Sequence, residues 1–304
     1  MNKIIEVTDL RKNYGSLAAV KGISFYVEQG KLFSFLGPNG AGKSTTIDIL
    51  CTLSKLSGGK ATIDGIDVQS GGRDIRQMIG VVFQNNTLDD LLTVRENLHY
   101  RAGLYTSDNT KIRNAVYEVT QAIELNEFID RPYGKLSGGQ RRRADIARAL
   151  VHTPKILFLD EPTTGLDPNT RRSIWNTIRQ LQLKTGMTVF LTTHYMEEAA
   201  ESDYVIVIDH GEIAAKGTPA ELKTQYATDL LRMSVLDEPA LQRVMKDLEL
   251  GFTVTAGEYT VKLPDTMAAI PILERCRTYI SSFQVLQGTM DDTFMGIIGK
   301  EMNQ

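Results

Sequence analysis

The stretch GPNGAGKS at positions 37–44 constrains the fold more than any other part of this chain. It fits the pattern G-x-x-x-x-G-K-[ST], and it stands between an apolar run at 31–37 and a helical pattern that begins at Lys43. Glycine lets the backbone turn tightly here, so that successive N–H groups point into a nest of phosphate size. A strand, a loop of this kind and a helix form one unit of an α/β sheet. The stretch therefore predicts an α/β fold that grips a phosphate.

The residues of this loop suit a nucleotide and its metal ion. Lys43 places a compact positive charge on the β- and γ-phosphates, and the Ser44 hydroxyl is a candidate ligand of Mg²⁺. We count Lys43 among the candidate catalytic residues as well. The predicted nucleotide-binding residues of the loop are Gly37, Pro38, Asn39, Gly40, Ala41, Gly42, Lys43, Ser44 and Thr45.

A second apolar run, at 155–160, ends in the adjacent carboxylates Asp160 and Glu161. A buried strand would place them at the edge where open α/β sheets bind ligands. Asp160 is then a candidate Mg²⁺ ligand, and Glu161 a candidate general base for an attacking water. Taken alone, such a pair is more often part of a solvated loop. The phosphate-binding loop upstream favours the functional interpretation.

Three further residues are candidates for the same site. Gln84 and His194 end the apolar runs at 78–84 and 187–194. Gln84 offers a neutral oxygen to the metal or the water, and His194 suits a contact with the γ-phosphate during hydrolysis. Tyr14 is a candidate for stacking on an adenine ring. For each residue a structural role stays open: a strand-end amide, a structural histidine and a partly buried aromatic ring.

The order of the elements favours an α/β core with an inserted helical part. Apolar strands at 155–160, 187–194 and 203–209 occur with a helical pattern at 170–186 between the first two. From about 85 to 150 the apolar spacing is mostly helical. We therefore predict a helical subdomain at about 85–150.

The stretch KLSGGQRRRADIARAL, which begins at Lys135, offers a second place that suits an anion. A Ser-Gly-Gly turn precedes a long helical run, and the free N–H groups and the dipole at a helix start favour negative charge. The arginines at 141–143 are interpreted as a solvated helix face. A nucleic-acid patch is disfavoured, because no aromatic residues are interleaved and the net charge of the chain is −3.

These motifs follow one another in the order found in ATP-binding-cassette (ABC) ATPases, which the chain resembles over roughly residues 3–222: the loop at 37–44, Gln84, LSGGQ, Asp160–Glu161, GLDP at 165–168, and His194. The resemblance implies a P-loop NTPase core with ATP and Mg²⁺ as its ligands. It also implies a head-to-tail dimer, formed with a second copy of this chain or with a related ATPase subunit. In that dimer the LSGGQ stretch of one chain binds the ATP of its neighbour. The residues expected to act in this way are Ser137, Gly138, Gly139, Gln140 and Asp167.

A change of composition at 216–230 marks a junction between two predicted domains. The first, at 1–222, is the nucleotide-binding domain. The second, at 228–304, shows the order β-α-β-β-α-β of a small α+β, ferredoxin-like sandwich. We expect this second domain to be accessory or regulatory, because nothing in its residues suggests catalysis.

The composition bears on compartment and partners. Cys51 and Cys276 lie far apart and outside any CxxC pair, which suits a reducing cytosol and argues against a disulfide or a zinc site. No stretch approaches the about 18 consecutive apolar residues that a membrane span needs. A role at a membrane therefore requires a partner. We expect a separate integral membrane permease that holds this chain as a peripheral subunit at the cytoplasmic face of the membrane, and no nucleic-acid partner.

Three classes of function are compared. The stretch from SGGQRRR to TTGLDP and the short C-terminal unit resemble ATPases of daunorubicin-resistance-type bacterial exporters. This favours a transporter subunit that hydrolyses ATP to power export of a drug, lipid or peptide. A non-transport ABC ATPase acting on ribosomes or DNA is disfavoured, because the chain has neither a tandem cassette nor a long coiled-coil insertion. An ATP-gated regulatory module is disfavoured because both Glu161 and His194 are present.

Overall fold

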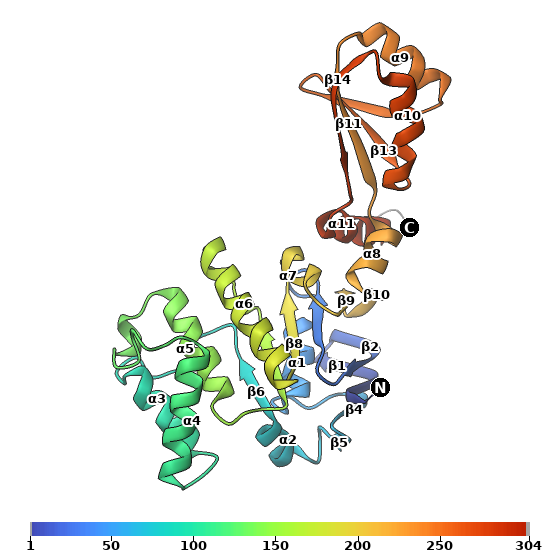
Figure 1. The fold of residues 1–304 in the computed structure, drawn as a ribbon. Coiled ribbons are helices and arrows are strands. Elements are labelled where there is room, and N and C mark those ends of the chain that lie inside the picture. Colours follow the sequence, from blue (N-terminus) through green and yellow to red (C-terminus); the bar gives the residue numbers. More distant parts are fainter. Residues whose placement is uncertain (1, 302–304) are drawn as a thin grey trace. The chain divides into compact units, whose positions relative to one another are not determined.

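The computed structural model describes residues 2–301, and the chain divides after Lys216 into two compact units. In Figure 1 the first unit runs from blue to yellow and the second is orange and red. No helix in residues 2–301 is both long enough and apolar enough to cross a membrane.

The first unit is built on a six-stranded sheet with the strand order β10-β9-β3-β8-β7-β6. Its strands are β3 (Leu32–Leu36), β6 (Ile79–Val82), β7 (Ile156–Asp160), β8 (Thr188–Thr193), β9 (Tyr204–Asp209) and β10 (Glu212–Gly217). The pairings that join β9, β3, β8, β7 and β6 are parallel, so that these strands end at one edge. Strands β3, β7 and β8 are buried at every position, which explains their continuous apolar runs. The predicted α/β core is confirmed.

A four-stranded sheet packs against the parallel one. Its strands are β1 (Lys3–Tyr14), β2 (Leu17–Glu28), β4 (Gly58–Ile63) and β5 (Ile66–Asp67), paired antiparallel in the order β2-β1-β4-β5. Phe25 of β2 contacts Phe33, Phe35 and Phe190 of the parallel sheet, with ring centroids 5.5 to 6.3 Å apart. Such aromatic pairs add about 0.5–1.5 kcal/mol each beyond the burial of their area. Helix α1 (Lys43–Leu50) contributes Ile47 to this core, which thus supports the loop before it.

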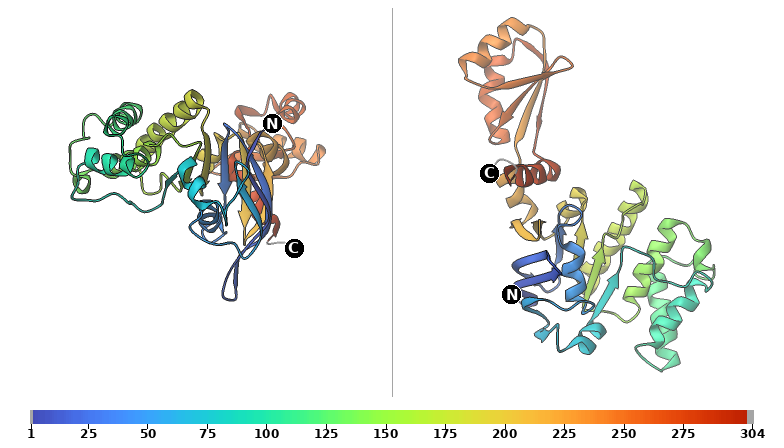
Figure 2. Two further views of the ribbon diagram at one scale, coloured as in Figure 1. Left: turned by 90° about the horizontal axis from the view of Figure 1, so that it is seen from below. Right: turned by 180° about the vertical axis from the view of Figure 1, so that it is seen from behind.

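Three helices form a lobe of their own, which both views of Figure 2 show in green. They are α3 (Val94–Gly103), α4 (Asn109–Ala122) and α5 (Gly138–Leu150), and all three fall within 85–150. Each begins at a side chain that accepts a hydrogen bond from the first helical turn: Thr93, Asp108 and Ser137. Outside this lobe, α2 (Gly72–Met78) precedes β6, α6 (Pro168–Thr185) follows β7, and α7 (Met196–Ala200) follows β8.

The second unit carries an antiparallel sheet with the strand order β12-β13-β11-β14. Its elements are α8 (Pro219–Tyr226), β11 (Asp229–Val235), α9 (Glu238–Asp247), β12 (Phe252–Thr255), β13 (Glu258–Leu263), α10 (Ala269–Cys276), β14 (Ile280–Leu286) and α11 (Met290–Glu301). From β11 to β14 the order is β-α-β-β-α-β. Leu241 and Met245 of α9 and Ile272 of α10 share a buried core with Leu231 and Met233 of β11. An accessory role for this unit stays a prediction.

Candidate nucleotide-binding and hydrolysis site

The loop between β3 and α1 has the conformation that a phosphate-binding turn requires. Gly40 and Gly42 have φ angles of 84° and 106°, in the region that favours glycine. A Cβ atom on Gly42 would lie 2.7 Å from the carbonyl oxygen of Ala19, and one on Gly37 would overlap the carbonyl oxygen of Ile208. The loop is therefore pressed against its neighbours at both ends, and a larger residue fits at neither end.

The side chain of Lys43 folds back over this loop. Its Nζ donates to the carbonyl oxygens of Gly37 (2.7 Å) and Pro38 (3.0 Å), and only 4% of the side chain is exposed. Glu161 Oε1 lies 3.6 Å from the same nitrogen. Burial lowers the pKa of Lys43, and the carboxylates of Glu161 and Asp160 oppose that shift. A buried cation thus stands at the loop, next to a candidate base.

Glu161 lies next to the other two candidate catalytic residues, Lys43 and His194. It follows the last residue of β7, its φ is 45°, and its N–H donates to the carbonyl oxygen of Thr192 (3.1 Å). Its Oε2 accepts a hydrogen bond from Thr164 (3.3 Å) and lies 3.4 Å from His194 Nδ1. Within residues 2–301 that buried nitrogen has no hydrogen-bond partner, so the histidine is adjacent to the carboxylate but not hydrogen-bonded to it. Lys43, Glu161 and His194 therefore lie together at the carboxyl edge of the parallel sheet.

Asp160 and Ser44 offer oxygen atoms to a metal ion. Ser44 Oγ donates to Asp160 Oδ1 over 3.2 Å, and the same oxygen accepts from Thr192 Oγ1 at 2.5 Å. Carboxylate and hydroxyl oxygens suit Mg²⁺, which protein sites hold through one or two carboxylates while phosphates and water supply the other ligands. No group of three or more His, Cys, Asp or Glu suited to a metal occurs within residues 2–301. The pair therefore fits a Mg²⁺ ion that arrives with a nucleotide.

Two predicted residues stand apart from this group. Gln84 lies two residues beyond the end of β6, its side chain is exposed, and it makes no hydrogen bond within residues 2–301. Tyr14 is the last residue of β1 and is 50% exposed, with Lys12 Nζ 4.8 Å from its ring centroid. The exposed ring of Tyr14 leaves area for a stacked base. Neither residue makes a hydrogen bond to Asp160 within residues 2–301.

The LSGGQ stretch lies on other elements. Ser137 begins α5, which packs on α3, α4, α6 and β6, whereas α1 packs on β2, β4 and β7. Ser137 and Gly138 are exposed. Ser137 and Gly139 also line an open hollow of about 680 Å³ together with Asn169 and Thr170 of α6. The LSGGQ stretch therefore lies at the protein surface, where a neighbouring subunit could reach it.

Three of the residues predicted to reach a neighbour's nucleotide, Ser137, Gln140 and Asp167, already make bonds inside this chain. Gln140 Oε1 accepts from the Ser137 N–H (3.1 Å), and Ser137 Oγ accepts from the Gln140 N–H (3.3 Å), which is a capping box. Asp167 Oδ1 accepts from the N–H groups of Thr170 (3.0 Å) and Asn169 (3.1 Å) at the start of α6. A side-chain hydrogen bond from Thr170, together with these N–H groups, lowers the pKa of Asp167. All three side chains therefore have only part of their hydrogen-bonding capacity free.

The interpretation of the arginine run as a solvated helix face is wrong for Arg142. This residue is 6% exposed, and its guanidinium donates to the backbone carbonyls of Phe83, Asp160, Glu161 and Pro162. Carbonyl groups at strand ends need donors when they are buried, and the guanidinium has five N–H groups to offer. The strand ends that meet here explain why this arginine turns inward.

Sequence reasoning also missed Glu198 on α7. This carboxylate is 2% exposed, and it accepts hydrogen bonds from Thr163 Oγ1 and, at 2.5 Å, from Thr193 Oγ1. Thr163 lies two residues after Glu161, and Thr193 directly precedes His194. One buried carboxylate therefore joins the two loops that carry the candidate catalytic side chains. The sequence gives little sign of this, because acidic residues in the first turn of a helix are ordinary.

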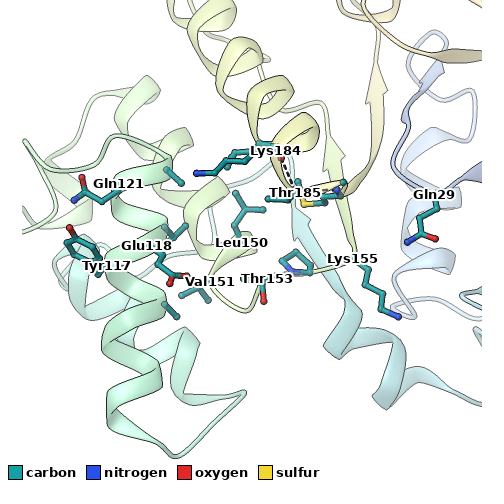
Figure 3. Close-up of a pocket in the computed structure, with 17 residues that line it drawn as sticks. Gln29, Tyr117, Glu118, Gln121, Leu150, Val151, Thr153, Lys155, Lys184 and Thr185 are labelled. Atoms are coloured by element: carbon teal, nitrogen blue, oxygen red, sulfur yellow. Dashed lines mark hydrogen bonds between the residues drawn. The ribbon is translucent and has the colours of Figure 1, made fainter.

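A cavity of about 810 Å³ lies elsewhere in the first unit, between α4 and the ends of α5 and α6 (Figure 3). Tyr117, Glu118 and Gln121 of α4 line it on one side, and Lys184 and Thr185 of α6 on another. None of the predicted site residues lines this cavity. It therefore has no part in the chemistry at the sheet edge.

Comparison with known proteins agrees with this geometry. The family model for ABC transporters matches residues 20–164. The daunorubicin/doxorubicin resistance ATP-binding protein DrrA of Streptomyces peucetius is 38% identical over 98% of this chain and 93% of its own length. The Nod factor export ATP-binding protein I of Rhizobium sp. (strain N33) is 35% identical over 100% of both chains.

Solved structures give the same result. The dimeric ATP-binding cassette MJ0796, bound to ADP and Pi in a post-hydrolysis state, has a TM-score of 0.65 and 30% identity, over 70% of this chain and 98% of its own. CbiO1 from Clostridium perfringens, part of the ABC transporter complex cbiONQ, has a TM-score of 0.69 and 29% identity, over 82% and 97%. The chain therefore belongs to the ATP-binding subunits of ABC transporters and is an ATPase of that family.

Proposed function

We propose that this chain binds ATP with Mg²⁺ at the β3–α1 loop and, as one half of a head-to-tail dimer, powers export through a separate membrane permease. One observation carries the proposal: Lys43, Glu161, His194 and Asp160 converge at one edge of the parallel sheet, whereas Ser137 lines a separate surface hollow. The names of the relatives, which speak of drug resistance and Nod factor export, favour export of a drug, lipid or peptide. The subunit would then work at the cytoplasmic face of the membrane.

The roles of the residues follow from their chemistry. Lys43 binds the β- and γ-phosphates, and Glu161 takes a proton from the water that attacks the γ-phosphate. His194, 3.4 Å from Glu161, orients that water and contacts the γ-phosphate. Ser44 and Asp160, with Gln84 swung toward them, would hold Mg²⁺, which neutralises charge on the phosphate oxygens. Tyr14 stacks on the adenine.

A dimer completes the site, because the loop covers only one side of a nucleotide. In a two-fold arrangement the contacts are isologous, so each chain supplies the missing side to the other. Gly138 and Gly139, through N–H groups at the start of α5, and Ser137, through its hydroxyl hydrogen, would cap the neighbour's γ-phosphate. Gln140 and Asp167 would contribute through the bonding capacity that capping leaves free. Loss of the γ-phosphate removes these bonds and lets the dimer open.

Mixed dimers test the shared site. Gly138→Asp is sterically mild, because a Cβ atom there meets only Leu166, at 3.7 Å, while the new carboxylate repels a γ-phosphate. We expect Gly138→Asp and Lys43→Ala homodimers to be inactive. A purified heterodimer of the two, with a different tag on each chain, should regain ATPase activity, because it contains one site with both parts intact. A heterodimer no more active than the two homodimers would show that the β3–α1 loop of one chain and the LSGGQ stretch of the other do not bind the same nucleotide.

A groove of about 490 Å³ beside Phe83 supports a permease partner of defined chemistry. Four arginines line it, Arg73, Arg76, Arg101 and Arg148, and among the residues that the structure describes no aspartate or glutamate does. The Nε atoms of Arg101 and Arg148 are buried without a hydrogen-bond partner in the described part of the chain. Burial and the charge of Arg101 lower the pKa of Arg148. An acidic segment of the permease would supply the anion that this groove lacks.

Pull-down of the tagged chain from membranes of its own cells, in mild detergent, tests this partner. We expect a polytopic membrane protein in stoichiometric amount with the natural chain. Arg73→Glu should recover several-fold less of it, whereas Arg113→Glu, a matched exposed arginine on α4 outside the groove, should recover as much. Equal recovery with both variants would contradict docking in the groove. Recovery of ribosomal proteins or DNA-repair factors instead would contradict the transporter.

A further inference from the structure

Arg142 joins α5 to the end of β7. Its Nη1 donates to the carbonyl oxygen of Phe83 at 2.6 Å, and its Nη2 donates to those of Asp160 (3.3 Å) and Glu161 (3.2 Å). Its Nε donates to the carbonyl oxygen of Pro162. Three consecutive carbonyls that span the candidate base are thus held by one buried side chain.

The backbone that Arg142 holds is strained. Glu161 has a φ of 45°, in the left-handed region that residues other than glycine seldom adopt. Such conformations cost on the order of 1–3 kcal/mol and persist only where the surroundings enforce them. The carbonyls on both sides of this φ angle accept from the same guanidinium, whose planar fork of donors fixes their relative orientation. The direction of the Glu161 side chain follows from this backbone turn.

Arg142 lies on α5, the helix that begins at the LSGGQ stretch. Ser137 is the N-cap of α5, and Arg142 lies in its second turn. A hydrogen-bonded helix moves as a unit over so short a distance, because each residue is bonded to the one four positions before it. A displacement of Ser137 is therefore passed to Arg142, and from there to the carbonyls of Asp160, Glu161 and Pro162.

We propose that Arg142 is a positioning residue: it holds Glu161 in its left-handed turn and links the placement of this base to the helix that Ser137 begins. The inference rests on the proposed role of Glu161 as general base. It assigns Arg142 no contact with ATP.

The first test compares Arg142→Lys with Arg143→Lys in the full chain. Lysine keeps the charge but replaces the planar fork by a single ammonium nitrogen with three N–H groups, too few for the four carbonyl bonds and not fixed in one plane. Arg143 is a matched control, because its guanidinium contacts Glu124 and Ser173 instead of β7. We expect kcat of Arg142→Lys to fall about 10- to 100-fold, as misplacement of a reacting group by about 1 Å does. Its KM and Kd for ATP should stay unchanged. For Arg143→Lys, kcat, KM and Kd should all equal those of the natural chain.

A double-mutant cycle with Glu161→Gln separates positioning from a general structural role. If Arg142 acts through the carboxylate, Arg142→Lys should cost nothing further in single-turnover hydrolysis by the Glu161→Gln chain. Equal losses in both backgrounds, or a kcat of Arg142→Lys equal to that of the natural chain, would overturn the proposal. Should Arg142→Lys not fold, Arg142→Gln, which keeps two N–H donors, takes its place with the same readouts. Normal turnover by Glu161→Gln would instead refute the base itself, so the two failures are distinguishable.

Discussion

Glu161→Gln should bind ATP as the natural chain does and accumulate as an ATP-bound dimer that turns over very slowly. The amide cannot accept the proton of the attacking water, and general-base catalysis contributes about 10²- to 10⁴-fold to such reactions. Binding should persist, because Lys43 also bonds to Gly37 and Pro38 and does not depend on Glu161 alone. The neutral side chain also removes a carboxylate that would repel the γ-phosphate.

Steady-state hydrolysis and size-exclusion chromatography with ATP and Mg²⁺ measure this outcome. Glu197→Gln is the matched control: Glu197 is exposed, lies three residues after His194 and is also a glutamate at this end of the sheet. Its turnover and its elution should equal those of the natural chain. Normal turnover in Glu161→Gln would remove Glu161 as the base, and loss of ATP binding would mean that its role lies in the ground state.

Lys43→Ala should weaken nucleotide binding and abolish turnover. The side chain is 4% exposed, and its ammonium stands at the loop where the phosphates are proposed to bind, with no other lysine or arginine among the loop residues 37–45. A hydrogen bond to a charged group is worth about 1.5–3 kcal/mol, so we expect affinity for ATP to fall about 10- to 150-fold. The loss should be larger in kcat/KM, because charge on the γ-phosphate changes during transfer.

Isothermal titration with ATP and steady-state hydrolysis test this second prediction. Lys31→Ala serves as control, since Lys31 is exposed and directly precedes the same strand, β3. It should leave both quantities unchanged. Unchanged hydrolysis by Lys43→Ala would contradict the proposal that the β3–α1 loop binds the phosphates.

The parts of the site that the sequence predicts are those whose chemistry is local. The loop at 37–44 is continuous in sequence, and the bonds of Lys43 to Gly37 and Pro38 close within it. Asp160 and Glu161 could be placed because an apolar run ends directly before them, which locates the edge of a buried strand. In each case the pattern and the structure share one short segment.

Arg142 and Glu198 could not be found in this way, because their partners come from other elements. The guanidinium of Arg142 is buried only once β6 and β7 end beside α5, and the carboxylate of Glu198 only once two loops meet over α7. Gln140 is a different case. Serine followed three residues later by glutamine is a capping-box pattern that is visible in the sequence, and this local role stands beside the predicted role toward a neighbour.

The contact between Lys43 and Glu161 has a consequence for the charge at the site. The ammonium and the carboxylate lie 3.6 Å apart, and each offsets the charge of the other. A triphosphate bound as we propose would compete with the carboxylate for that ammonium, since both are anions. The proposed base and the proposed substrate would then share one cation, so a change at Lys43 would alter the surroundings of Glu161 as well as the binding of phosphate.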